Sequence, residues 1–101
     1  MAEYRLSPAA QRDLEGLFDY TAARWGLAQA TRYTDAIEAA CAEMAEAPFQ
    51  GQDCSHIRSG YRRRGAEHHM IYFRPAEYGI AVVRILHQRM DAARHLAATS
   101  T

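Results

Sequence analysis

Residues 68–87 read HHMIYFRPAEYGIAVVRILH, and this stretch decides the fold class. Residues 68–74 and 79–87 are rich in β-branched and aromatic side chains, and only the turn-forming stretch 75–78 separates them. Two such runs joined by so short a connection predict a β-hairpin. The run 79–87 is apolar at both alternating sets of positions, so we expect a central strand covered on both faces.

Two helices are expected before these strands. Ser7 and Pro8 are typical of a helix N-cap followed by the first helical residue. Gly26 should end this helix, and Pro48 should end a second helix over residues 27–47. The connection between them is so short that it predicts an antiparallel helical hairpin. Steps of three and four residues place one set of side chains on a single face of the first helix: Ala10, Leu14, Leu17, Phe18, Thr21 and Trp25.

The remaining segments complete an α+β chain. They are expected as a short strand at 4–6, a loop at 49–55, a strand at 57–64 with a turn at 65–67, and a short helix at 92–97. We therefore expect one domain over residues 1–101. In it, the helical hairpin packs on one face of a small, mainly antiparallel sheet.

Alternation along the strands assigns apolar side chains to both faces of this sheet. The chain has no second pair of long helices to cover the face that the hairpin leaves open. An apolar surface ringed by arginines would remain, which is typical of a partner-binding site. The two expected sets are Ile71, Phe73, Val83 and Ile85 under the hairpin, and Met70, Tyr72, Val82 and Leu86 on the opposite face.

The composition excludes several classes of protein. Twelve cationic residues, all of them arginine, balance 12 acidic residues, which argues against a general polyanion binder. No apolar run approaches the ~20 residues needed to cross a bilayer, and the alternating N-terminus is not typical of a signal peptide. Cys41, Cys54 and the five histidines match no metal-ligand spacing. We therefore expect a reduced, cytoplasmic protein without a membrane segment, metal or cofactor.

Several stretches together resemble the ParE-type toxins of the RelE/ParE superfamily. They are IRSGYRRR at 57–64, HMIYFR at 69–74 and VRILHQRMD at 83–91, preceded by YRLS at 4–7 and by Tyr20 with Trp25 and Gly26. The likeness covers nearly the whole chain, in order and with matching spacing.

This resemblance implies a RelE-like fold and the toxin role in a type II toxin–antitoxin pair. ParE toxins inhibit DNA gyrase and trap it on cleaved DNA. A ParD antitoxin binds such a toxin through its C-terminal segment and represses the operon through its own DNA-binding domain. Operator DNA would therefore be reached only indirectly, through the antitoxin, and the toxin would arrest growth by binding.

The alternative is a RelE-like ribonuclease that cuts mRNA on the ribosome. Such an enzyme needs a base, an acid and cations for the phosphate. The RelE pattern supplies lysines, arginines and a C-terminal tyrosine, or a Glu–His pair in relatives. This chain has no lysine, and its last tyrosine, Tyr78, falls in a turn. We therefore expect no catalytic residues, although Arg62, Glu67, Arg84 and His87 leave a residual nuclease possible.

Two sets of contact residues follow from this interpretation. An acidic antitoxin should use buried anchors and a charged rim, because such anchors carry most of the affinity. We also expect the segment 88–96 to serve toxicity more than folding. For the antitoxin the set is Leu17, Tyr20, Arg58, Arg62, Tyr72, Arg74, Val82 and Leu86, and for the toxic target it is Arg84, His87, Arg89, Arg94 and His95.

Overall fold

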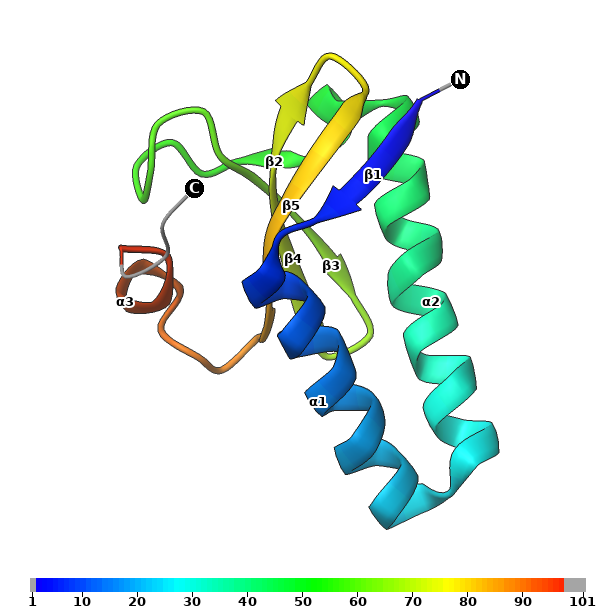
Figure 1. Ribbon diagram of the computed structural model, residues 1–101. Helices are drawn as coiled ribbons and strands as arrows, with labels where there is room; N and C mark the ends of the chain where they lie inside the picture. The colour runs from blue at the N-terminus through cyan, green and yellow to red at the C-terminus, as the bar shows by residue number, and fades with distance from the viewer. Residues whose placement is uncertain (1, 98–101) are drawn as a thin grey trace.

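The computed structural model describes residues 2–97, which form a five-stranded sheet with a helical hairpin on one face and a short helix beyond the other (Figure 1). The strand order is β1-β5-β4-β3-β2, with β1 parallel to β5 and every other pair antiparallel. The predicted α+β class is therefore confirmed. The elements are β1 (Glu3–Leu6), α1 (Pro8–Trp25), α2 (Leu27–Glu46), the 3-10 turn η1 (Pro48–Gln50), β2 (Gln52–Asp53), β3 (Arg62–Ala66), β4 (His69–Ala76), β5 (Gly79–His87) and α3 (Ala92–Ala97).

The helical hairpin begins and turns where the sequence predicts. The Ser7 hydroxyl accepts a hydrogen bond from the Ala10 backbone N–H at 3.0 Å and donates one to the Val83 carbonyl at 2.8 Å. The same side chain thus caps α1 and ties it to β5. Gly26 alone connects the two helices with φ of 94°, a conformation that favours glycine. No helix within residues 2–97 is long and apolar enough to cross a membrane.

The predicted strand at 57–64 is misplaced. The strand β3 begins only at Arg62 and continues to Ala66, and the hairpin turn to β4 lies at Glu67 and His68. Residues 54–61 instead form successive turns, with Gly60 at φ of 82°. Apolar alternation could not reveal this, because Tyr61 is buried, and Ile57 partly buried, by the turns rather than by strand pairing.

The assignment of Val82 and Val83 to the two sheet faces is also wrong. Tyr72 pairs with Arg84, but its neighbour Phe73 pairs with Val82, so β5 contains an extra residue at a β-bulge. The bulge reverses the alternation within the strand. Val82 consequently packs with the hairpin core, and Val83 packs on the opposite face.

That opposite face, called here the second face, is not an open apolar surface. The turns at residues 54–61 and the helix α3 cover it, and Leu96 is 0% exposed. The prediction of an uncovered face is therefore wrong, because a short helix and irregular turns replace the missing long helices. The buried cluster is Cys54, Tyr61, Tyr72, Val83, Leu86 and Leu96.

The hairpin core under α1 and α2 is largely as predicted, except at the far end of α1. Ala10 and Ile37 are completely buried with the sheet residues Ile71 and Phe73. Cys41 is a free, buried thiol, and burial raises its pKa to about 12. Trp25, expected in the core, is 68% exposed. The hairpin extends beyond the end of the sheet, so no strand lies under its last turn (Figure 1).

Candidate partner-binding groove

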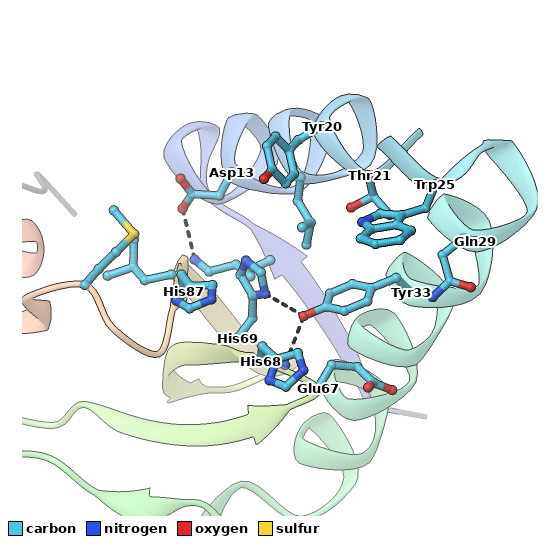
Figure 2. Close-up of a pocket in the computed structure, with 14 residues that line it drawn as sticks. Asp13, Tyr20, Thr21, Trp25, Gln29, Tyr33, Glu67, His68, His69 and His87 are labelled. Atoms are coloured by element: carbon cyan, nitrogen blue, oxygen red, sulfur yellow. Dashed lines mark hydrogen bonds between the residues drawn. The ribbon is translucent and has the colours of Figure 1, made fainter. Parts of the chain in front are cut away.

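An open groove of about 810 Å³ lies between the helical hairpin and the end of the sheet where β4 begins and β5 ends (Figure 2). It exists because the two helices extend past the end of the sheet at the hairpin turn (Figure 1). Near the hairpin turn the helices stand clear of the strands. The groove is lined by Asp13, Leu17, Tyr20, Thr21, Trp25, Gln29, Tyr33, Glu67, His68, His69, Ile85, Leu86, His87 and Met90.

Asp13 forms one end of the groove and joins α1 to β5. Its carboxylate accepts two hydrogen bonds from the Arg84 guanidinium, at 2.7 and 2.9 Å, and one from the Ile85 backbone N–H at 2.9 Å. The two side chains are 15% and 19% exposed. The hydrogen bond and charge of Asp13 raise the pKa of Arg84 above its ordinary value. This bidentate pair is structural, and it leaves Arg84 few free donors for another anion.

Tyr33 and two histidines form the floor. The Tyr33 hydroxyl accepts a hydrogen bond from the His68 backbone N–H at 2.9 Å and lies 2.8 Å from Nδ1 of His69. Burial, with the nearby His87 and His68, lowers the pKa of His69 to about 4. The Nδ1 of a neutral His69 can accept a hydrogen bond from the Tyr33 hydroxyl. These contacts tie α2 to the β3–β4 turn (Figure 2).

His87 ends β5 beside this floor. Its ring meets the ring of His69 edge to face, with 5.3 Å between centroids. Nδ1 of His87 accepts a hydrogen bond from the Arg89 backbone N–H at 3.1 Å. Nδ1 is therefore an acceptor in a local turn, which holds the chain as it leaves the sheet toward α3.

The mouth of the groove is apolar and exposed. Tyr20, Trp25 and Met90 are 60%, 68% and 41% exposed. Trp25 lies at the end nearest the hairpin turn, and Tyr20 lies along α1 (Figure 2). Exposed aromatic and methionine side chains above a polar floor suit a partner segment with one apolar face and some hydrogen-bonding groups.

The residues predicted to bind an antitoxin are divided between the groove and the core. Leu17 and Tyr20 line the groove. Tyr72, Val82 and Leu86 are 4%, 0% and 2% exposed, so their side chains are largely enclosed by the protein itself. Leu86 reaches the groove only as part of its wall. The basis for placing anchors on the second face is thus lost.

The three arginines of the predicted rim do not surround one site. Arg62 is held on the hairpin side, where its guanidinium donates to the Gly51 carbonyl at 2.8 and 3.0 Å. Arg58 donates to the Leu96 carbonyl at 3.4 Å, on the second face. Arg74 is exposed and shares a cross-strand row with Arg5. None of the three lines the groove.

The residues predicted to contact the toxic target lie near the end of β5 and on α3. His87 lines the groove, Arg84 is engaged by Asp13, and Arg89 and Arg94 are exposed. His95 is half-buried on α3. Of the five residues, Arg89 and Arg94 are the two with exposed side chains.

Three polar residues that shape the groove, Asp13, Tyr33 and His69, were not predicted from the sequence. Asp13 stands three residues after Ala10 and four before Leu17, and this spacing places it on the edge of the inner face of α1. That spacing could have identified it. The meeting of Tyr33 with His69 depends on tertiary packing and had no local signal.

The described residues contain no metal-binding cluster. Within residues 2–97, no group of three His, Cys, Asp or Glu side chains is placed to hold a metal ion. The histidines of the groove instead contact one another and Tyr33.

Comparison with known proteins identifies the family. The sequence model described as "ParE toxin of type II toxin-antitoxin system, parDE" matches residues 4–92. The chain belongs to the ParE toxin family. It is a ParE-type toxin of a type II toxin–antitoxin system, and the resemblance seen in the sequence is confirmed.

Relatives of similar length support this assignment. Toxin ParE1 of Mycobacterium tuberculosis is 45% identical over 96 residues, covering 94% of this chain and 98% of its own. Toxin ParE1 of Caulobacter vibrioides is 38% identical, covering 95% and 99%, and Toxin ParE of Escherichia coli is 39% identical, covering 96% and 95%.

A solved structure confirms the fold of this ParE-family toxin. A chain described as the chromosomal ParDE TA system from P. aeruginosa superposes with a TM-score of 0.73 at 20% identity. The match covers 86% of this chain and 96% of that chain.

Proposed function

We propose that this ParE-family toxin arrests growth by binding DNA gyrase and that a ParD-like antitoxin neutralises it. The observation that carries the proposal is the near full-length likeness to proteins named ParE toxins, over residues 4–92. Such a target places the action in the cytoplasm. The toxin would meet operator DNA only through the antitoxin.

We propose further that the toxin acts by binding and not by catalysis. Cleavage of RNA needs cationic groups free to stabilise the phosphate as charge develops. Arg84, whose partner Asp13 lines the groove, already donates to that carboxylate in a bidentate pair. The chain has no lysine to take its place. The low pKa of His69, about 4, leaves it a weak base at neutral pH.

The groove is the proposed docking place of the antitoxin's apolar side chains. It is a concave surface of about 810 Å³, and Leu17 and Tyr20 lie in its wall. The antitoxin anchors proposed at Tyr72, Val82 and Leu86 would require these side chains to become accessible, whereas Tyr20 is accessible already. The groove also adjoins the segment that leads to Arg89 and Arg94, so an antitoxin bound there would cover the proposed target surface.

The groove assignment is tested with Tyr20→Ala and a matched control. Tyr20 is 60% exposed, so its truncation should leave the fold intact while weakening antitoxin binding by about tenfold or more. Phe49→Ala removes another exposed aromatic ring, which lies outside the groove, and the affinity of this variant for the antitoxin should equal that of the wild type. The affinities are measured by calorimetry. If Tyr20→Ala binds antitoxin as tightly as Phe49→Ala does, the antitoxin does not dock in the groove.

The ribonuclease alternative is tested with His87→Ala. The binding account predicts that neither the wild-type toxin nor the folded His87→Ala variant cuts mRNA on translating ribosomes, whatever the variant's effect on growth arrest. Loss of growth arrest together with loss of ribosomal mRNA cleavage, while antitoxin binding persists, would establish a nuclease instead.

A further inference from the structure

The turn of the helical hairpin exposes apolar side chains that the fold does not need. Trp25 and Leu27 flank Gly26, and each is 68% exposed. The turn itself depends on Gly26, whose φ of 94° requires glycine, and not on the two residues beside it. Polar residues would form the same turn without placing an indole and an isobutyl group in water.

This end of the molecule also differs in charge from the rest of the hairpin. Residues 20–34 contain Arg24 and Arg32 and no acidic residue. The rest of the hairpin, residues 8–19 and 35–47, carries one arginine, Arg12, and seven acidic residues: Asp13, Glu15, Asp19, Asp35, Glu38, Glu43 and Glu46. The hairpin tip, defined by Arg24, Trp25, Leu27 and Arg32, is therefore a cationic and apolar point on an otherwise acidic arm.

The tip is presented rigidly. One residue connects α1 to α2, and the Gly26 backbone N–H donates to the Ala22 carbonyl at 2.9 Å. Tyr33, less than two turns into α2, is tied to His68 and His69 of the sheet. A convex element that is already ordered loses little conformational entropy when it binds.

We propose that the hairpin tip inserts into an apolar pocket rimmed by carboxylates on the toxin's protein target. Trp and Arg are enriched among residues that dominate binding energy. Arg24 and Arg32 supply charge complementary to an acidic rim. A convex tip needs a preformed concavity, which a large folded enzyme offers and a segment that folds on the toxin surface does not. The inference rests on the proposed function, since it takes gyrase as that target.

The tip and the groove can be tested separately. Leu27, Arg24 and Arg32 do not line the groove, whereas Trp25 lies where the groove meets the tip (Figure 2). Leu27→Ser and Arg32→Glu are therefore the primary variants. Phe49→Ala is the matched control, because Phe49 is 74% exposed beside Arg62 at the opposite end of α2, about 30 Å away along the helix.

The experiment measures the toxin concentration that gives half-maximal cleavage of supercoiled plasmid by gyrase holoenzyme. Leu27→Ser and Arg32→Glu should each raise this concentration by about tenfold or more, since removing a buried anchor costs that much affinity. Phe49→Ala should behave as the wild type. All three variants should bind antitoxin with wild-type affinity. Wild-type potency of Leu27→Ser and Arg32→Glu would overturn the proposal.

Two further measurements separate this inference from its premise. Wild-type toxin that traps no gyrase would contradict the proposed target, and the tip is then judged by growth arrest in cells without antitoxin. If Leu27→Ser arrests growth as strongly as the wild type does, the proposed role of the hairpin tip is wrong, whichever protein the toxin targets. Sedimentation of the wild type, but not of Leu27→Ser, with anionic phosphatidylglycerol vesicles would also overturn it, by making the tip a membrane contact.

Discussion

The Asp13 carboxylate and the Arg84 guanidinium meet in a bidentate pair, at 2.7 and 2.9 Å, between the first helix and the last strand. The same carboxylate accepts the Ile85 backbone N–H. One short side chain thus fixes the distance between α1 and β5 and shapes one end of the groove. Arg84, proposed from sequence as a target contact, thus also helps to position α1 on β5.

Asp13→Ala should destabilise the protein by about 2 kcal/mol, because it leaves a largely buried guanidinium and one N–H without their acceptor. The measurement is urea unfolding. Glu15→Ala, two residues along on the exposed surface, should change the free energy of unfolding by less than about 0.5 kcal/mol. Equal effects of the two substitutions would show that the pair does not hold α1 on the sheet.

Stability should fall in acid through His69. Its folded pKa, about 4, lies below the ordinary value of 6.5, so between these values the unfolded chain binds a proton that the folded chain does not. The contribution of neutral His69 is complete above pH 6.5 and is lost as pH falls toward about 4. The facing groups are His68, His87, Asp13 and Tyr33.

The check compares unfolding free energies of the wild type and His69→Asn at about pH 7.5 and about pH 5. Asparagine keeps a hydrogen-bond acceptor but does not titrate in this range. The wild type should lose more stability on acidification than the variant does. Identical losses would place the titration elsewhere.

Leu96→Ala should destabilise the protein by about 2–5 kcal/mol, because Leu96 is completely buried on the second face. Arg94→Ala, two residues earlier and exposed, should have little effect on stability. Such a loss in Leu96→Ala would show that the segment 88–96 contributes to folding through Leu96. Arg89→Ala and Arg94→Ala test its proposed role in toxicity more cleanly than truncation, since they leave Leu96 in place.

Gly79→Ala should loosen β1 from the sheet. A Cβ at this position would collide with backbone atoms of Glu3, and φ of 142° is unfavourable for other residues. The expected cost is about 2 kcal/mol or more. Gly16→Ala is the control, and it should change the free energy of unfolding in the opposite direction. Open space surrounds Gly16 on α1, so alanine should stabilise the helix by roughly 0.5–1 kcal/mol. Faster amide exchange in β1 should accompany the first substitution only.

Much of this fold could be predicted because its signals are local. Ser7, Gly26 and Pro48 mark the helix boundaries, and the predicted bounds of β5 match the structure. The bulge at Val83 could not be predicted. Apolar residues fill both alternating sets of positions in β5, so the pattern is compatible with either register of β5 against β4. Leu96 lies ten residues after Leu86 in sequence, yet both belong to one buried cluster.

The groove itself had no signature in the sequence. It forms where the helical hairpin extends past the sheet, and its floor brings together Tyr33 and His69, which lie 36 positions apart. Trp25 follows the apolar spacing of α1, and Tyr20 is an aromatic residue of the kind that often packs in a core. Both are exposed, because no strand lies beneath them. Periodicity predicts which side chains face inward, and it cannot predict where the neighbouring layer ends.

The most direct test of the account is incubation of purified toxin with gyrase and supercoiled plasmid, followed by denaturation of the enzyme and measurement of linear DNA. The account predicts that linear DNA, covalently bound to gyrase, accumulates with toxin concentration and disappears when antitoxin is present in equal amount. Unchanged cleavage at toxin concentrations that arrest growth would contradict it, because the target would then not be gyrase.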